Sequence, residues 1–338
     1  MNRRAIGWTI GATFALLLSV IIAIGMGAAS LDVHTTFSAL TCRIFDSGCG
    51  AVSKKDLVII WDIRAVRIAL AILVGFGLSI CGAVIQSLVR NIMADPYLLG
   101  IASGASTGAA TVMVFGVAGA VGLTAGAFLG ALTAITAVLA LTSVAGTITA
   151  ERVVFAGITI GLFMMAIMNI VIMVFGNEGA ARAVMFWMLG YLGGAHWYKL
   201  VLPFLVLIFT FVFCMAIGPR LDAISLSDET ARILGFNPQR LRIIAIIVVS
   251  GCVAALVAVS GTIGFVGLVI PHLARRLVGA TSRSVIPVSG VLGALLLMWA
   301  DTLGRTMFSP RELPIGVVTA LIGTPVLMVL IRRQYRST

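Results

Sequence analysis

The chain has 338 residues, of which 60% are hydrophobic and only 10% are charged, and its formal net charge is +11. A soluble domain carries about 25% charged residues, so this composition excludes an ordinary soluble enzyme and indicates a membrane protein. The positive charge does not indicate nucleic-acid binding, because the arginines are distributed between long apolar runs instead of forming one basic patch.

Ten apolar runs follow one another, each near the roughly 20 residues that a helix needs to cross a bilayer. We expect an all-α polytopic membrane protein, one domain over residues 1–338, with spans at 6–29, 65–86, 96–115, 117–146, 153–175, 198–218, 241–260, 263–278, 285–304 and 313–331. The first run could be a signal peptide. It is longer than the usual apolar core of about 7–15 residues, so we interpret it as the first spanning helix.

The charges of the loops predict the orientation. An even number of spans places both termini on one side of the membrane, and that side carries fourteen of the lysines and arginines against nine on the other. Cytoplasmic loops are enriched in Lys and Arg, so both termini are predicted to lie in the cytoplasm and the protein in the cell membrane.

Glycines recur at every fourth position in two series, Gly100, Gly104 and Gly108, and then Gly122, Gly126 and Gly130. Each series places a smooth stripe on one face of a helix. Such stripes let neighbouring membrane helices approach closely, so we expect both series to lie in helix–helix contacts.

The cysteines fall into two groups. Cys81, Cys214 and Cys252 lie inside apolar runs and are interpreted as packing residues. Cys42 and Cys49 lie in the polar segment Thr41–Lys55, which we place outside the cell. A disulfide between them and two free thiols both remain open, because connectivity does not follow from sequence.

The longest predicted cytoplasmic segment covers residues 219–240 and contains the signals of a short helix. Ser227 can accept from free N–H groups at the helix start, and Asp228 and Glu229 favour its positive end. Gly235 can end the helix in a left-handed conformation, and Asn237-Pro238 can start the next one. Two acids make lipid binding the weaker interpretation, so we expect a partner protein.

The residues needed for catalysis are missing. The lysines, Lys54, Lys55 and Lys199, are not followed by Ser or Thr, so the chain cannot carry a Walker A site. The three histidines have no metal-ligand spacing, and we predict no catalytic residue and no metal site. If ATP drives the protein, another subunit binds ATP and Mg²⁺.

Two features inside the spans have competing interpretations. Asp301 is an intramembrane acid, and a structural partner such as Arg305, one turn later, is favoured over a proton relay. The methionines Met164, Met165, Met168 and Met173 either line a transport pathway, where soft side chains suit a bulky ligand, or serve helix packing.

Several motifs taken together resemble the FecCD family, the permease subunits of ABC importers for iron–siderophore complexes, haem and vitamin B12. They are Trp61-Asp-Ile-Arg64-Ala-Val-Arg67, Gln86 through Arg90-Asn91 to Gly100, Phe186-Trp187-Met-Leu-Gly190, Leu226 through Gly235, Gly261 through Arg276, Ala300-Asp301 with Arg305, and Glu312-Leu-Pro-Ile-Gly316. Val66 and Ile92 stand where the family usually has proline.

The resemblance implies the architecture of a type II ABC importer. Two permeases, identical or paralogous, would form a dimer in the membrane with two ATPase subunits below and an extracytoplasmic binding protein above. The family's coupling helix corresponds to Ser227, Asp228, Glu229, Thr230, Ala231, Arg232, Leu234 and Gly235. External arginines that pair with glutamates on the binding protein correspond to Arg64, Arg67 and Arg305.

By the same register, the cytoplasmic gate falls at Thr149, Ala150 and Glu151, although Glu151 departs from the small hydroxyl residues common there. The function implied is import of an iron–siderophore complex by ATP-driven alternating access, with haem or cobalamin as alternative substrates. A self-sufficient secondary transporter is the rival class, and we find neither paired broken helices nor a cluster of intramembrane acids to favour it.

Overall fold

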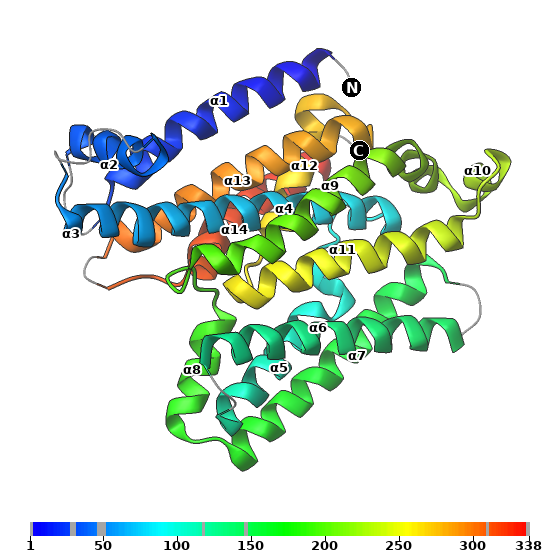
Figure 1. Ribbon diagram of the computed structural model, residues 1–338. Coiled ribbons are helices and arrows are strands. Elements are labelled where there is room, and N and C mark those ends of the chain that lie inside the picture. Colours follow the sequence, from blue (N-terminus) through cyan, green and yellow to red (C-terminus); the bar gives the residue numbers. More distant parts are fainter. Residues whose placement is uncertain are drawn as a thin grey trace.

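The computed structural model describes residues 3–27, 32–45, 52–116, 119–144, 148–308 and 311–335, and every regular element within these ranges is helical (Figure 1). The elements are α1 (Arg3–Gly25), α2 (Val33–Phe45), α3 (Lys54–Leu57), η2 (Val58–Ala65), α4 (Val66–Val89), η3 (Pro96–Leu99), α5 (Ile101–Phe115), α6 (Gly119–Val144), α7 (Ala150–Ile170), η4 (Val171–Phe175), α8 (Glu178–Met188), α9 (Trp197–Leu226), α10 (Asp228–Ile233), α11 (Pro238–Ser260), α12 (Val266–Val278), α13 (Ser282–Thr306) and α14 (Ile315–Tyr335).

Each of the ten predicted apolar runs coincides with a helix, in order α1, α4, α5, α6, α7, α9, α11, α12, α13 and α14. Within the described residues, seven helical segments are long and apolar enough to cross a membrane alone. The 15 residues of α5 extend only about 22 Å, less than the roughly 30 Å of a bilayer core. The 3₁₀ turn η3 directly precedes α5 and shares Gly100 with it as a cap.

Helix α4 lies at the centre of the bundle, where α13, α11, α12 and α9 pack around it. Its residues are almost all buried, which matches its nearly continuous apolar sequence. In contrast, α1 and α7 expose most of their apolar side chains, as expected for helices that face lipid or a second membrane subunit.

Two members of each predicted glycine series face each other in the contact between α5 and α6, whereas Gly100 lies against Gly157 and Gly161 of α7. A Cβ atom added at Gly104 would lie 2.4 Å from the carbonyl oxygen of Gly130, and one at Gly108 would lie 2.0 Å from that of Gly126. No side chain fits at these distances, so the close approach of the two backbones requires glycine. The packing role predicted for these residues is confirmed.

Hydropathy did not predict α2 and α8, which are short helices of mixed composition between the spans. Cys42 lies in α2 and is disulfide-bonded, whereas Cys49 lies outside the described residues. Cys81, Cys214 and Cys252 are buried free thiols, as their apolar surroundings predicted.

The start of α1 and the end of α14 both lie toward the end of the bundle that carries α10, whereas α2 and α3 lie at the opposite end (Figure 1). An even number of spans requires this arrangement. We call the two ends the α10 end and the α2 end.

Candidate coupling and gating site

The short helix α10 is built as its sequence predicted. The Ser227 hydroxyl accepts a hydrogen bond from the backbone N–H of Thr230 at 2.9 Å, which caps the helix start. Gly235 has φ +84°, the left-handed conformation that ends it. Asn237 then caps α11, because its side-chain oxygen accepts from the N–H of Gln239 at 2.9 Å.

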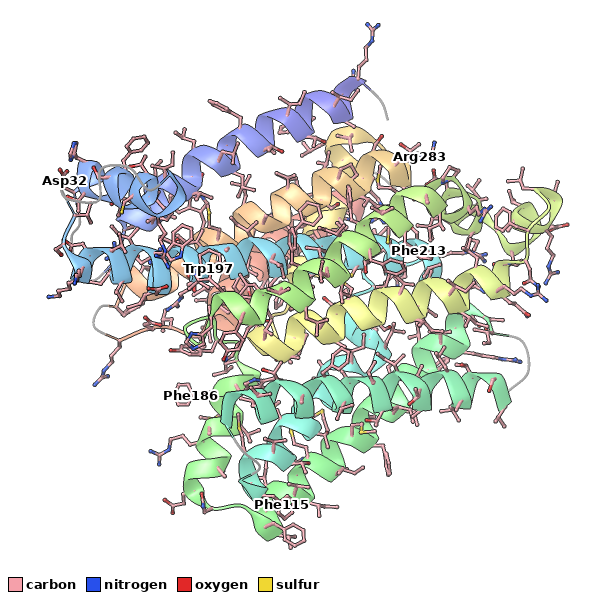
Figure 2. The ribbon with its side chains drawn as sticks, in the orientation of Figure 1. Asp32, Phe115, Phe186, Trp197, Phe213 and Arg283 are labelled. Carbon is pink, nitrogen blue, oxygen red and sulfur yellow. The ribbon has the colours of Figure 1, made fainter. Side chains whose placement is uncertain are left out.

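Helix α10 lies at one end of the bundle (Figures 1 and 2), and three apolar side chains around it are exposed. Leu226 is 74% exposed, Ile233 80% and Leu234 63%, whereas Ala231 is fully buried. Ala231 faces the bundle and anchors the helix, while the exposed apolar side chains point away from it. Exposed apolar groups on a polar end of a membrane protein indicate a contact with another protein.

Asp228, the first residue of α10, ties the helix to two other elements. Its carboxylate accepts from Arg242 of α11, with Nη2 and Oδ1 2.9 Å apart, and also from Nη2 of Arg90 at the end of α4. Arg90 also donates through Nε to the Ile224 carbonyl in α9 at 2.7 Å. This carboxylate therefore joins the ends of α4, α10 and α11, and Arg90 connects them to α9.

The two arginines also control the ionisation of this carboxylate. Burial alone would raise the pKa of Asp228, but the hydrogen bond and charge of Arg242, together with the charge of Arg90, outweigh burial and lower this pKa below its usual value. Asp228 is therefore ionised at neutral pH.

The predicted gate residues form the start of α7. Thr149 caps this helix by accepting from the N–H of Arg152 at 3.4 Å, and Glu151 is exposed in the first turn. The preceding residue, Ile148, offers its carbonyl to Nη1 of Arg242 at 2.9 Å. Arg242 thus contacts both α10 and the residue just before the predicted gate, and the structure brings the predicted coupling and gate residues together.

The predicted docking arginines form one buried cluster at the α2 end. Arg67 donates through Nε to both carboxylate oxygens of Asp301 at 3.0 Å, and through Nη1 to Glu312 at 2.9 Å. Arg305 lies 3.8 Å from Asp301, so the predicted pair exists, although Arg67 is the closer partner.

The other bonds of this cluster hold the end of α1. Arg64 donates to the carbonyl oxygens of Ile24 and Gly25 at 2.9 and 3.0 Å, and Arg305 donates to that of Ala23 at 2.6 Å. Arg64, Arg67 and Arg305 are only 4%, 8% and 8% exposed. Their burial and internal bonding do not support the expectation that these guanidinium groups are open to an outside partner.

The candidate pathway methionines do not share one surface. Met168 is 5% exposed and packs with Ala110 and Val184, whereas Met165 is 43% exposed. The carbonyl of Met164 accepts from the Thr107 hydroxyl at 2.8 Å, which joins α5 to α7. Packing explains Met168, whereas Met165 and Met173, the latter 85% exposed, are open to their surroundings.

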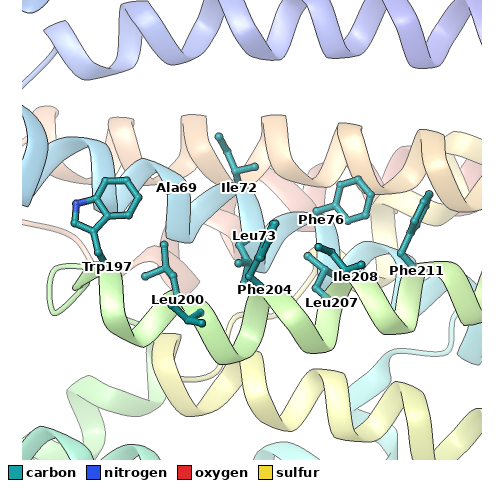
Figure 3. Close-up of a pocket in the computed structure, with 11 residues that line it drawn as sticks. Ala69, Ile72, Leu73, Phe76, Trp197, Leu200, Phe204, Leu207, Ile208 and Phe211 are labelled. Carbon is teal, nitrogen blue, oxygen red and sulfur yellow. The ribbon is translucent and has the colours of Figure 1, made fainter. Parts of the chain in front are cut away.

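An apolar groove runs between α4 and α9 (Figure 3). Ile72, Leu73 and Phe76 of α4 line it with Trp197, Phe204 and Leu207 of α9, and none of its lining residues is charged. This lining offers little to a charged or chelated ligand. An entirely apolar lining of this kind is suited to contact with the hydrocarbon chains of lipids.

Sequence reasoning missed Arg242, which it counted only as one cytoplasmic cation, and the linking role of Gln86. The Gln86 side chain donates to the carbonyls of Ala94 and Leu268, at 3.2 and 3.0 Å, and accepts from Arg275. A charged or amide residue inside an otherwise apolar helix was the available signal. Its partners lie too far along the chain to be read from spacing.

The apolar helices define an integral membrane protein, and the family match and relatives given next identify it as an ABC transporter permease. The model of the FecCD transport family matches residues 15–333, and the chain belongs to this family. ABC importer permeases of this family act on varied substrates, as the relatives show.

Two relatives and one solved structure illustrate the similarity. The chain is 37% identical to the Fe(3+)-citrate import system permease protein YfmE of Bacillus subtilis, over 96% of this chain and 94% of that protein. It is 36% identical to the hemin transport system permease protein HmuU of Yersinia pestis, over 95% of each. An ABC transporter assigned to the metal-chelate type, solved in an inward-facing conformation, superposes with a TM-score of 0.85, at 28% identity over 96% of this chain and 98% of that one.

Proposed function

We propose that this protein is the permease subunit of a binding-protein-dependent importer that carries an iron–siderophore complex across the cell membrane. Its relatives include permeases for ferric citrate and hemin, so an iron chelate is the substrate class that both have in common. Haem itself and cobalamin are the alternatives, since a vitamin B12 permease of Vibrio cholerae is also 32% identical.

The transport cycle requires two kinds of partner. The chain has no Walker A sequence, so ATP and Mg²⁺ would be bound by two separate ATPase subunits at the α10 end, which we assign to the cytoplasm. A second permease, identical or paralogous, would complete the pathway between the two chains. An extracytoplasmic binding protein would deliver the chelate at the α2 end.

The exposed apolar surface of α10 carries this proposal. Leu226, Ile233 and Leu234 stand out at one end of the bundle and are 63–80% exposed, while Asp228 fixes the helix to α4 and α11. A rigidly mounted helix with exposed apolar residues is suited to fit a cleft on another protein. ATP binding in that protein would move α10 and switch the permease between outward-open and inward-open forms.

The docking role of Arg64, Arg67 and Arg305 is proposed in an indirect form. Their buried cluster fixes the ends of α1, α4 and α13 relative to one another. A binding protein would then recognise the shape that this cluster maintains, and electrostatic attraction from the surrounding loops would speed its approach.

Transport in proteoliposomes tests the proposal. The permease, its genomically adjacent ATPase and its binding protein would be reconstituted, and uptake of radiolabelled ferric siderophore, haem and cobalamin compared. We expect ATP-dependent uptake of the ferric siderophore, which an ATPase subunit lacking its Walker A lysine abolishes. Preferred uptake of haem or cobalamin would show that this compound, and not a ferric siderophore, is the substrate. Uptake by the permease alone without nucleotide would exclude an ABC importer.

A further inference from the structure

The Arg242 side chain bonds both α10 and the backbone just before α7. Its Nη2 lies 2.9 Å from Oδ1 of Asp228, and its Nη1 lies 2.9 Å from the Ile148 carbonyl oxygen and 3.4 Å from Oδ2 of Asp228. The planar guanidinium holds its donors in fixed relative positions, so the two contacts cannot vary independently.

The side chain is also almost completely buried. Arg242 is 1% exposed, and its Nε finds no hydrogen-bond partner among the described residues. Asp228 is the acid that pairs with it, and the side chain of Asp228 is 30% exposed. A buried arginine that loses its carboxylate is strongly unfavourable, because the charge then lies in a poorly solvated site without compensation.

These contacts constrain how α10 can move. If a partner displaces α10, Asp228 moves with it, because Asp228 is the first residue of that helix. Arg242 must then follow the carboxylate or become hydrated, and either change alters its hydrogen bond to Ile148. Thr149, the next residue, caps α7, so a shift at Ile148 reaches the start of that helix directly.

We propose that Arg242 is a positioning residue that transmits displacement of α10 to the start of α7, where the candidate gate residues Thr149, Ala150 and Glu151 lie. The inference rests on the proposed function, because it assumes that an ATPase subunit moves α10. It adds a specific route, from the Asp228 carboxylate through one guanidinium to one backbone carbonyl.

Arg90 provides a matched control. It bonds the same carboxylate, but its second bond goes to the Ile224 carbonyl in α9 and not to the gate segment. Arg90→Lys therefore weakens the anchoring of α10 without touching Ile148. Arg242→Lys keeps a positive charge beside Asp228, but a single ammonium cannot reproduce the planar fork that spans both partners.

The test measures gate accessibility. Ala150→Cys is half-buried at the start of α7 and reports on the gate, while Cys81, Cys214 and Cys252 are buried. The reconstituted permease–ATPase complex would be labelled with a small charged maleimide, without nucleotide and with a non-hydrolysable ATP analogue. Uptake by the Ala150→Cys complex confirms that the reporter itself is tolerated.

The ratio compared is the faster labelling rate divided by the slower one, of the two measured with and without the ATP analogue. We expect this ratio to fall by at least about fivefold in Arg242→Lys, which is the lower end of ordinary coupling between sites. Arg90→Lys should keep the ratio, and both variants should still bind the ATPase. If Arg242→Lys does not fold, the neutral pair Asp228→Asn with Arg242→Gln removes the buried charge together with its partner and should lower the ratio likewise.

The outcomes separate the two proposals. An unchanged ratio in the Arg242 variant that folds overturns the role of Arg242. An equal fall of the ratio in Arg90→Lys overturns it as well, because general loosening of α10 would then explain the effect. If the reference complex with Ala150→Cys alone binds no ATPase or shows no response to nucleotide, the proposed function fails first.

Discussion

Arg67 and Asp301 are 234 positions apart in the sequence, yet Nε of Arg67 lies 3.0 Å from both carboxylate oxygens of Asp301. Nη2 of Arg67 adds an ion-pair contact of 2.9 Å. This pair joins the start of α4 to the end of α13. Asp301 is 2% exposed, so the pair lies in a poorly solvated part of the bundle.

Replacing Asp301 by asparagine should destabilise the protein strongly. The variant leaves Arg67 with Glu312 alone and Arg305 without an acidic partner, and breaking a buried ion pair costs about 3–5 kcal/mol. The measurement is the free energy of unfolding in detergent, taken from denaturant titration. Glu312→Gln is the control: its side chain is 42% exposed, so the expected cost is below about 1 kcal/mol. Equal costs for the two variants would contradict the assignment of Asp301 as the central acid.

Gly108→Ala should disrupt the contact between α5 and α6. Its Cβ atom would lie 2.0 Å from the Gly126 carbonyl oxygen, and overpacking of this kind costs about 1–3 kcal/mol. Gly251→Ala in α11 is the matched control, because an added Cβ there meets no atom within 4 Å. Thermal unfolding in detergent compares the two, and a lowered midpoint in Gly251→Ala alone would refute the close-contact explanation.

Replacing Ile233 and Leu234 together by serine should weaken binding of the ATPase subunit. Both side chains are more than half exposed and contribute little to the fold, so the loss should fall on the interface. We expect at least a tenfold weaker affinity, about 1.4 kcal/mol, measured by surface binding in detergent. Ile63→Ser, 56% exposed at the α2 end, is the control and should leave the affinity unchanged. Normal binding by the double variant would mean that α10 is not the contact.

The mobility of α10 should depend on pH only in acid. The pKa of Asp228 is lower in the folded protein than its ordinary value of 3.8, so the contacts of its carboxylate are fully present above pH 3.8. They are lost as the pH falls through the lower, folded-state pKa. A spin label at Ile233→Cys should therefore be equally restrained from pH 7 to about pH 4 and become mobile below.

The same label in Asp228→Asn should be mobile at neutral pH and insensitive to acid. A label that becomes mobile between pH 7 and 5 would show that a group other than Asp228 restrains α10.

Hydropathy and capping rules predicted much of this fold. The ten apolar runs became helices, because burying or lipid-coating 20 apolar residues dominates every other local preference. Ser227 and Gly235 were predictable for a different reason: capping depends on residues two or three positions away. The helices α2 and α8 were missed because they are short and mixed in composition, so no apolar periodicity marks them.

The charged residues were harder to predict. Loop counting placed Arg64, Arg67 and Arg305 on the outer side, and the family resemblance implied that they face a binding protein. In the structure, each has partners from a distant segment. Arg242 was missed for the same reason. Its partner Asp228 is 14 positions away, and Ile148 is 94 positions away. Such pairings depend on which helices become neighbours, and a single sequence does not contain that information directly.

The bonds from Arg64 and Arg305 to the end of α1, which together act as a clamp, have a consequence for the order in which the protein is synthesised and assembled. Arg305 reaches back 282 positions to the carbonyl of Ala23, so translation at about 5–20 residues per second separates the two residues by roughly 15–55 seconds. During that interval the first helix has left the ribosome and entered the bilayer, but one of the two side chains that secure its end does not yet exist. The segment made earliest is thus fastened by one of the segments made last, and a nascent chain halted before Arg305 would leave α1 with only half of its clamp.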